Sequence, residues 1–365
     1  MSVLTIVLFC LGIAALVAGA DLLVRGASSI AVAAGISPLV VGLTVVAYGT
    51  SAPELAVSVS AALAGHSDLA VGNVVGSNIA NILLILGISA VAAPLVVHQQ
   101  LIRLDVPLMI GIFGVLYLMS LDGVLSRIDG IVLAIGSAVY TVFAILKSRR
   151  ETRRVRQEYE KKYGEAPETP RRRHAGIDLL LIAAGTFLLW LGARWLVHSA
   201  TVIASLFGIS QLVIGLTVVA VGTGLPELAT SVIASFRGER DISVGNVVGS
   251  NIFNVLAVLG VTAMVAPAGV GVPASAVSFD MPVMLAVAVA CLPIFFNGYR
   301  IARWEGAIFV FYYAAYVAYL VLQATEHDAL PIFSRSMMTF VIPITVLTLI
   351  VVTLRSFRRQ IRDQS

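Results

Sequence analysis

Charged residues are scarce in this chain. Asp, Glu, Lys and Arg make up 12% of its 365 residues, whereas hydrophobic residues make up 59%. A soluble domain carries about 25% charged residues. The low charge excludes an ordinary soluble protein and indicates that lipid surrounds most of the chain.

Cysteine and histidine are scarce as well. The two cysteines, Cys10 and Cys291, lie within apolar runs, so we expect no disulfide framework. The five histidines are scattered, which argues against a zinc or copper site. The sequence has no HExxH, GKS, GKT or EF-hand pattern. We therefore predict a protein that is not an enzyme and that uses no cofactor.

Eleven apolar runs approach the length of about 20 residues that a helix needs to cross a bilayer. They lie at 3–24, 38–64, 69–97, 106–121, 130–146, 177–199, 211–236, 242–267, 281–297, 304–322 and 337–354. The first run resembles a signal peptide, but it lacks a basic start and is too long, so we interpret it as a retained helix. The predicted fold class is an all-α integral membrane protein.

One long polar segment, 147–174, separates the fifth and sixth runs. It holds eleven Lys and Arg against five Asp and Glu, which places it in the cytoplasm. Binding to nucleic acid or anionic lipid is the alternative, but a solvated linker is the usual state of such a charge run beside membrane helices. The N-terminus is then outside and the C-terminus inside. This topology puts 21 of the 24 Lys and Arg residues on the cytoplasmic side.

The stretch GNVVGSNI occurs twice, at 72–79 and at 245–252. At this constant offset of 173, residues 36–87 and 209–260 are identical at 34 of 52 positions. Each half has five spans, an odd number, so the second half must insert upside down. Inverted repeats of this kind are typical of secondary transporters, which bind their cargo where the repeats meet. We predict two inverted five-helix repeats, 1–146 and 175–322, joined by the linker 147–174, and an extra helix and basic tail in 323–365.

A second duplicated motif precedes each GNVVGSNI stretch: GTSAPEL at 49–55 and GTGLPEL at 222–228. Pro53 and Pro226 each remove a backbone donor and break or kink the helix. Broken helices are tolerated at membrane depth only where they are buried in protein or line a cavity. We expect the breaks to free backbone carbonyls from Ala47 to Thr50 and from Ala220 to Thr223 for a ligand.

A glutamate follows each proline. A carboxylate near the bilayer centre costs about 2.5–3.5 kcal/mol on insertion scales, so Glu54 and Glu227 need a reason to be there. Ser51 and Glu54 fit a helix capping box, which is the structural alternative. The second copy has Gly224 in place of the serine and still keeps Glu227. This difference favours cation ligation over capping.

Helical spacing adds more oxygen atoms to the predicted site. Four pairs are four residues apart and share a helix face: Thr50 with Glu54, Ser77 with Asn81, Thr223 with Glu227, and Ser250 with Asn254. The set contains oxygen ligands only, which suits a hard cation such as Ca²⁺ better than a soft metal. Mg²⁺ is less suited because it dehydrates reluctantly.

Other polar residues in the spans are given structural roles. The motif glycines form G-x-x-x-G faces that let helices approach closely, and the motif asparagines are expected to hydrogen-bond between helices. These residues are Gly72, Gly76, Gly245, Gly249, Asn73, Asn78, Asn246 and Asn251. Asp105 and Asp280 each precede a proline at a predicted helix start, which favours N-capping. Asp21 and Arg25, four residues apart, are expected to pair.

The two copies of GTxxPE…GNVVGSNIxN resemble the α-repeats of the cation/calcium antiporter superfamily, and most closely those of prokaryotic sodium/calcium exchangers. The resemblance implies that Glu54 and Glu227 bind Ca²⁺ and Na⁺ alternately. It implies further ligands at Ala47, Thr50, Ser51, Ser77, Asn81, Ala220, Thr223 and Ser250. Many members of that family have serine at the position of Gly224 and aspartate at that of Asn254. The second departure leaves two carboxylates and argues against potassium co-transport.

The sequence therefore predicts an antiporter that exchanges Ca²⁺ for Na⁺ across the cell (inner) membrane. Its partners are the lipid bilayer and the two ions, and neither nucleic acid nor an obligate protein partner is inferred. A proton-coupled antiporter remains the nearest alternative, because burial favours the protonated form of a carboxyl group. A cation channel is a third possibility, which would need a continuous pore.

Overall fold

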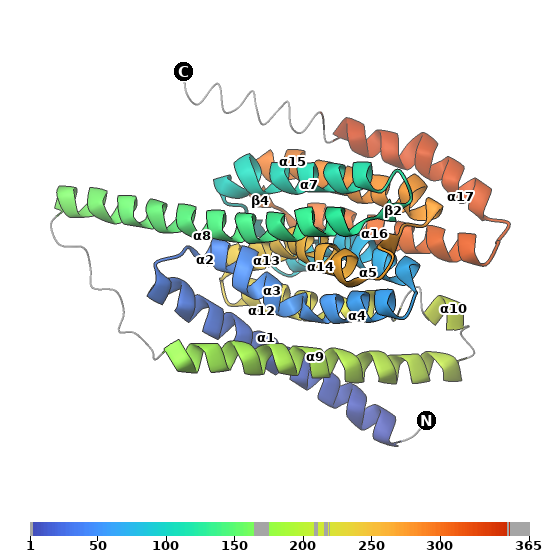
Figure 1. The fold of residues 1–365 in the computed structure, drawn as a ribbon, viewed down its shortest axis with the longest axis horizontal. Coiled ribbons are helices and arrows are strands. Elements are labelled where there is room, and N and C mark those ends of the chain that lie inside the picture. Colours follow the sequence, from blue (N-terminus) through green and yellow to red (C-terminus); the bar gives the residue numbers. More distant parts are fainter. Residues whose placement is uncertain are drawn as a thin grey trace.

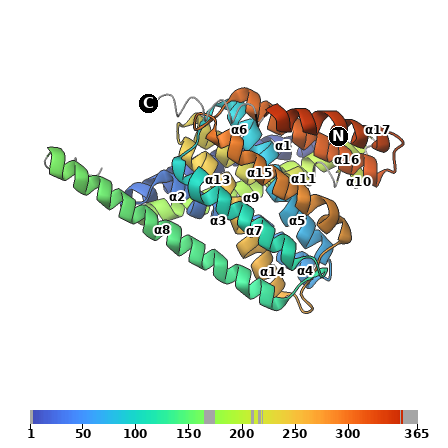
Figure 2. The ribbon, with the colours of Figure 1, turned by 90° about the horizontal axis from the view of Figure 1, so that it is seen from above.

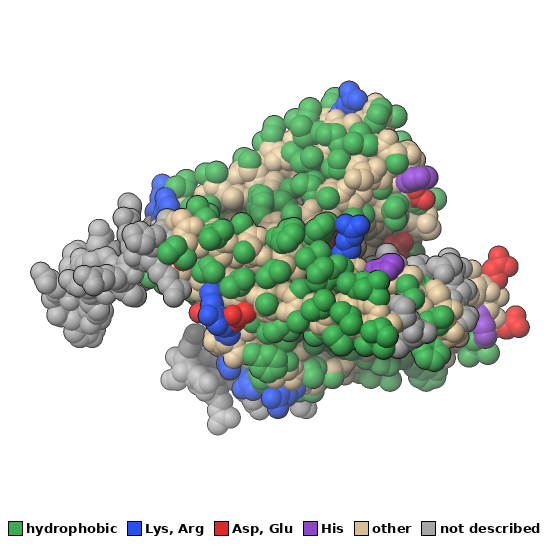
Figure 3. Space-filling model, turned by 90° about the horizontal axis from the view of Figure 1, so that it is seen from below, with side chains coloured by type: hydrophobic (Ala, Val, Ile, Leu, Met, Phe, Trp, Pro, Cys, Tyr) green, Lys and Arg blue, Asp and Glu red, His purple; other side chains and the backbone are tan. Residues whose placement is uncertain are grey.

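The computed structural model describes residues 3–163, 175–207, 211–214, 218, 220–348 and 350. Within them, nine helices are long and apolar enough to cross a membrane, and Pro38–Thr50 with Ala52–Leu63 adds a tenth span bent by 45°. The helices lie side by side in a bundle (Figure 1). Hydrophobic side chains cover the middle of the face shown in Figure 3, and most charged side chains lie toward its two ends. The protein is an integral membrane protein built from helices.

The first half runs from α1 to α8. Its elements are α1 (Val3–Ala34), α2 (Pro38–Val41), η1 (Gly42–Val46), α3 (Ala47–Thr50), α4 (Ala52–Leu63), α5 (Ser67–Ala80), η2 (Asn81–Leu86), α6 (Gly87–Ala92), β1 (Leu95–Val96), η3 (Leu101–Asp105), α7 (Val106–Met119), β2 (Val124–Leu125) and α8 (Arg127–Tyr163). The label η marks a π-helical segment. Consecutive α and η segments form continuous spans, apart from the break at Ser51.

The second half repeats this order, and a further helix follows it. Its elements are α9 (Ala175–Leu206), α10 (Gln211–Ile214), α11 (Ala220–Thr223), α12 (Leu225–Phe236), α13 (Arg240–Phe253), η5 (Asn254–Leu259), α14 (Gly260–Val265), β3 (Val270–Gly271), η6 (Ala276–Asp280), α15 (Met281–Phe296), β4 (Arg300–Ile301), α16 (Arg303–Ala324), α17 (Leu330–Ser336) and η7 (Met337–Val341). The expected seventh span, 211–236, lies partly outside the described residues.

Two short strand pairs connect the halves. β1 pairs with β4, and β2 pairs with β3, both antiparallel. The predicted topology places the loops of β1 and β4 on one side of the membrane and those of β2 and β3 on the other. Each pair therefore joins loops that the inverted-repeat topology puts on the same side.

Glycines set the closest helix contacts. Gly12 and Gly19 of α1 lie against Gly192 and Gly185 of α9, so that an added Cβ would come within about 3 Å of the facing backbone. α1 and α9 cross on one face of the bundle (Figure 1). The close approach predicted for Gly245 and Gly249 is confirmed, because Gly245 lies against the backbone of α2 and η1 and Gly249 against that of η1. Gly72 and Gly76 would face the second-half counterparts of these α2 and η1 residues, and not all of those counterparts are described. The close approach expected at Gly72 and Gly76 therefore stays a prediction.

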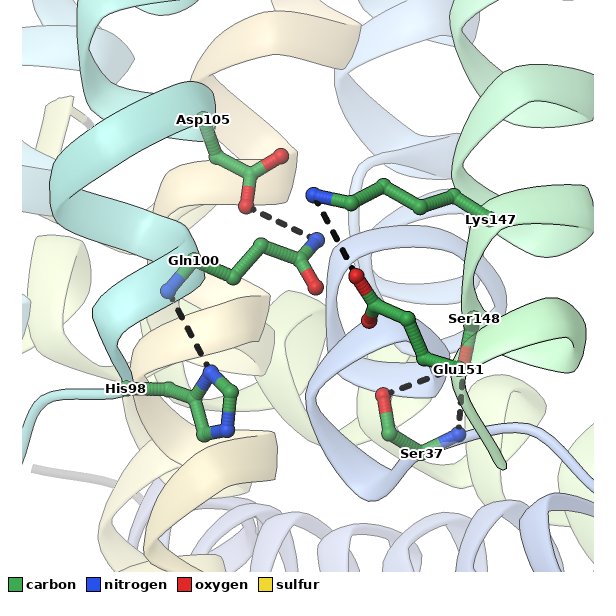
Figure 4. Close-up of polar contacts among 7 residues, drawn as sticks. All are labelled: Ser37, His98, Gln100, Asp105, Lys147, Ser148 and Glu151. Atoms are coloured by element: carbon green, nitrogen blue, oxygen red, sulfur yellow. Dashed lines mark hydrogen bonds and ion pairs between the residues drawn. The ribbon is translucent and has the colours of Figure 1, made fainter. Parts of the chain in front are cut away.

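The prediction that Asp105 and Asp280 cap helices is wrong. Both have helical backbone angles, because a π-helical segment precedes each of them, and neither side chain caps. Asp105 is buried and accepts hydrogen bonds from Gln100 Nε2 (3.1 Å) and the Tyr140 hydroxyl (3.2 Å), as Figure 4 shows for Gln100. Asp280 accepts one from the Tyr316 hydroxyl (2.8 Å). Each aspartate thus ties the fourth helix of its half to the fifth.

The helix α8 continues far beyond the membrane span. It extends past its neighbours in two perpendicular views (Figure 1 and Figure 2). Ser148 of α8 accepts a hydrogen bond from the backbone N–H of Ser37 (2.8 Å), which starts the broken span (Figure 4). Within the basic segment that begins at residue 147, the chain is helical as far as Tyr163. The domain division at residue 146 stays a prediction.

Candidate functional site

The two glutamates occupy equivalent positions in the first turns of α4 and α12. Each follows a helix break, at Ser51 in the first half and at Gly224 in the second. Both side chains are only 1% exposed. Among the described residues, neither glutamate belongs to an ion pair. Their charges are thus enclosed without a basic partner from the described part of the chain.

The capping alternative for Ser51 is wrong. Its side chain makes no capping bond at the start of α4. The Ser51 hydroxyl instead donates to Oε1 of Glu227 in the other half of the chain (3.0 Å). A residue of one repeat therefore orients the carboxylate of the other.

The helix break was expected to free the backbone carbonyl of Ala47, but this carbonyl has hydrogen-bond donors within the protein. Its oxygen accepts the backbone N–H of Ser51 (3.0 Å) and the hydroxyl of Thr50 (3.4 Å). The break therefore does not leave this oxygen without protein donors. Its role as a ligand stays a prediction, as does that of Ala220, whose side chain is outside the described part of the structure.

The motif asparagines hold the broken helices in place. Asn246 Nδ2 donates to the backbone carbonyl of Glu227 (3.4 Å) and to the Ser231 hydroxyl (3.0 Å). Its Oδ1 accepts from the Thr50 hydroxyl (3.2 Å), which links the halves a second time. The predicted role in interhelical hydrogen bonding is confirmed for Asn246.

The first half repeats this pattern. Asn73 Nδ2 donates to the carbonyl of Glu54 (3.3 Å) and to the Ser58 hydroxyl (3.0 Å). Sequence reasoning assigned no role to Ser58 or Ser231. Their position, four residues after each glutamate on the same helix face, is a signal that could have found them.

Asn254 is oriented by a third asparagine. Its Nδ2 donates to Oδ1 of Asn78 (3.1 Å), and Asn78 Nδ2 in turn donates to Sδ of Met284 (3.6 Å). The interhelical role expected for Asn78 is therefore confirmed. The Oδ1 atom of Asn254 is buried and has no partner among the described residues.

Both candidate amide ligands begin π-helical segments. Asn81 starts η2 and Asn254 starts η5. Short π-helical segments inside α-helices are rare and occur frequently at functional sites. α4 contacts η5, and α12 contacts η2, so each glutamate-bearing helix meets the asparagine segment of the opposite half. The sequence carried no signal for these segments.

Several buried polar atoms in this region have no hydrogen-bond partner within the described ranges. The oxygens are Oε1 and Oε2 of Glu54, Oε2 of Glu227, Oγ of Ser250, Oγ1 of Thr230, Oδ1 of Asn251 and Oδ1 of Asn254. Most buried polar atoms in proteins are paired, and each exception calls for an explanation. Oxygens of carboxylate, hydroxyl and amide groups are the ligands that hard cations take.

The other predicted ligands lie on the same elements. Ser77 on α5 is 6% exposed, and Thr50 on α3 is 1% exposed. Thr223 ends α11 and is partly buried. No group of three or more His, Cys, Asp or Glu residues gathers to hold a metal anywhere in the described ranges. Any cation here would be held by two carboxylates and neutral oxygens.

Comparison with known proteins covers both halves of the chain. The family described as sodium/calcium exchanger protein matches residues 4–146 and 177–322. The inner membrane protein YrbG of Escherichia coli is 40% identical over 222 residues, 61% of this chain and 67% of YrbG. The putative antiporter CaxA of Alkalimonas amylolytica is 42% identical over 254 residues, 68% of this chain and 77% of CaxA.

A solved structure is similar as well. It is that of the sodium-calcium exchanger NCX_Mj soaked with zero Na⁺ and Ca²⁺, at 30% sequence identity and a TM-score of 0.73. The match covers 88% of this chain and 100% of that one. The two halves therefore share their sequence and their arrangement in space with a protein described as an exchanger.

Proposed function

We propose, because the chain belongs to the sodium/calcium exchanger protein family, that it exchanges Ca²⁺ for Na⁺ by alternating access. Membership makes it a calcium/cation exchanger of the membrane and not an enzyme, and the transported ions are its substrates rather than cofactors. The proposal concerns the sodium coupling, the ligands and the orientation. The observation that carries it is that Glu54, Glu227 and the polar residues of the neighbouring motif segments hold buried oxygens with no partner among the described residues.

Charge balance explains why this site exchanges ions rather than leaks them. Two carboxylates are neutralised by one Ca²⁺ or by two Na⁺. Without a cation, both negative charges would be desolvated, and removing an unpaired charge from water is strongly unfavourable. A transition between the two faces is therefore favoured only when the site is loaded.

The neutral oxygens favour Na⁺ over H⁺ as the coupling ion. A proton needs only a carboxylate to bind to. Sodium, a hard cation, needs several oxygens around it, and both halves supply hydroxyl groups: Thr50, Ser51 and Ser77 in the first, Thr223 and Ser250 in the second. Ser51 and Thr50 already reach across to the second half through Glu227 and Asn246. We assign the hydroxyl groups to cation binding on this basis.

The orientation follows from the basic residues. We place the chain in the cell (inner) membrane with its N-terminus outside, and with the linker 147–174 and the C-terminus in the cytoplasm. The E. coli relative is described as an inner membrane protein. Strand pairs between loops of the same predicted side support the order of the spans, whichever side faces the cytoplasm.

A transport assay with separate gradients tests the coupling ion. Proteoliposomes loaded with Na⁺ and diluted into sodium-free buffer should take up Ca²⁺, and K⁺ should not be required. Proteoliposomes with only a pH gradient should take up no more than protein-free liposomes. Strong uptake driven by the pH gradient in sodium-free buffers would replace Na⁺ by H⁺ and leave the calcium site in place.

Substituting Asn254→Asp should change the coupling. Asn254 donates to Asn78 Oδ1 (3.1 Å), and an aspartate can donate there only when it is protonated. We expect the pH profile of Ca²⁺ uptake by the variant to be shifted from that of the wild type, because a third carboxyl group titrates in the site, with a change of about tenfold per pH unit at one end of the profile, as for a single titrating group. Uptake measured between pH 5 and 9 tests this. The conservative variant Asn254→Gln, which keeps an amide, should keep the wild-type pH profile, and a wild-type profile for the aspartate variant would contradict the prediction.

A further inference from the structure

Asp21 on α1 binds two arginines. One is Arg25, one turn further along the same helix, at 2.9 Å. The other is Arg237, which lies at the end of α12, the helix that carries Glu227. The Asp21 side chain is 26% exposed and the Arg237 side chain 35% exposed, so the pair between them is partly shielded from solvent. This ion pair ties α1 to the far end of α12.

Apolar packing accompanies the ion pair. Leu225, Ala229 and Ile233 on α12 pack against a buried cluster that includes Leu16 and Ala20 of α1. Pro226, beside Glu227, is buried. The approach to Glu227 along α12 is therefore covered by α1.

The equivalent place in the first half has a groove beside α4, although Glu54 itself is buried. A groove of about 430 Å³ lies between α4 and α9, lined by Ala52, Pro53 and Ala56 on one side and by Phe187 and Trp190 on the other. It reaches Pro53, the residue before Glu54. The two repeats thus differ in shape: one glutamate-bearing helix is covered, and the other borders a groove.

The sequence offset explains why the described residues of the first half show no equivalent ion pair. GADLLV at 19–24 aligns with GARWLV at 192–197, so Asp21 corresponds to Arg194. At the same offset Arg237 corresponds to Ala64. An arginine and an alanine cannot pair, and Arg194 instead lies over the ring of Trp190, 5.6 Å from its centroid. The sequence itself therefore makes the two halves differ in this ion pair, in a region where they otherwise align without gaps.

We propose that the Asp21–Arg237 ion pair is a one-sided latch that holds α1 against α12 and biases the exchanger toward the state open along α4. The inference rests on the proposed alternating access, in which the covered and open sides exchange. Opening along α12 must separate α1 from that helix and so break the pair. No equivalent ion pair opposes closure of the groove between α4 and α9, because Arg194 and Ala64 supply none. With the proposed orientation, the latch closes the cytoplasmic side.

Cysteine accessibility tests the latch without relying on transport. In a background of Cys10→Ser and Cys291→Ser, single cysteines at Ala56, in the groove, and at Ala229, under α1, are treated with a water-soluble methanethiosulfonate reagent. We expect the Ala56→Cys protein to react faster than Ala229→Cys. Adding Arg237→Gln should raise the reaction rate at position 229 by about twofold to fivefold, the effect of a partly exposed ion pair, and lower it at position 56.

The chain offers a matched control for this experiment. Arg25 binds the same carboxylate from within α1, so Arg25→Gln removes an arginine without unlinking the helices and should leave both rates unchanged. Arg237→Lys keeps the charge and should behave like the wild type, and Asp21→Asn should behave like Arg237→Gln if either variant folds poorly. Unchanged rates in both Arg237→Gln and Asp21→Asn, or an equal effect of Arg25→Gln, would overturn the latch. Sodium-driven uptake measured in parallel separates this outcome from a failure of the proposed function.

Discussion

Replacing Glu54 or Glu227 by glutamine is expected to reduce Ca²⁺ exchange by about 100-fold or more. Glutamine keeps the shape of the side chain and removes one of the two negative charges at a site where each carboxylate is 1% exposed. A bound Ca²⁺ would then carry an uncompensated charge through the membrane interior. An unpaired charge there costs about 2.5–3.5 kcal/mol on insertion scales, and each 1.4 kcal/mol is a factor of ten. Initial rates of Ca²⁺ uptake into Na⁺-loaded proteoliposomes measure the loss.

A third buried glutamate supplies the control. Glu305 is 3% exposed, and it accepts hydrogen bonds from the backbone N–H of Ala302 (2.7 Å) and from Asn297 (3.3 Å), so its environment is complete. Glu305→Gln should retain Ca²⁺ exchange within a few-fold of the wild type. Exchange near the wild-type rate in Glu54→Gln or Glu227→Gln would show that the carboxylate concerned is not a ligand.

Gly249→Ala should destabilise the protein by about 1–3 kcal/mol or more, the cost of overpacking a filled core. A Cβ atom at Gly249 would lie 2.6 Å from the Cα and carbonyl oxygen atoms of Leu43, which are backbone atoms and cannot rotate away. Leu43 belongs to η1, the segment that leads into the first helix break. We therefore expect both a lower thermal unfolding midpoint of the purified protein and a lower rate of Ca²⁺ exchange.

Gly111 is the matched helical glycine. It lies in α7, where an added Cβ would meet no described atom of another helix within 4 Å. Because alanine favours helix over glycine by about 0.8–1.0 kcal/mol, Gly111→Ala should leave the unfolding midpoint unchanged or raise it. The two substitutions are chemically identical, yet only Gly249→Ala is expected to lower the unfolding midpoint. Equal unfolding midpoints for both variants would contradict the close approach of α13 to η1.

The duplicated motifs by themselves determined the plan of the protein. Two near-identical stretches separated by an odd number of spans require an inverted repeat, because each span reverses the direction of the chain. A proline at the same place in both copies indicated a break or kink in each helix, because proline cannot donate the backbone hydrogen bond. A glutamate retained directly after each break indicated the centre of the site. These inferences depend only on the covalent chemistry of the chain and on the absence of water from the bilayer.

Local reasoning failed where the partner of a side chain lies far away in sequence. Ser51 fitted a capping box with its neighbour Glu54, but its hydroxyl bonds to Glu227, 176 residues away. Asp105 preceded a proline as a helix cap does, but it is bonded to Tyr140 on another helix. The π-helical turns at Asn81 and Asn254 have no sequence pattern. Such choices depend on which helix faces which, and neighbouring residues do not encode this.

The difference between the halves was decided only by the tertiary structure. Identity at 34 of 52 positions suggests two equivalent halves, yet Pro226 is buried under α1, whereas Pro53 borders a groove. In alternating access the site is never open to both sides at once, so two halves with similar sequences need not have the same shape. A repeated sequence determines the two states that are available to each half. The packing of α1 against α12 decides which half adopts which state.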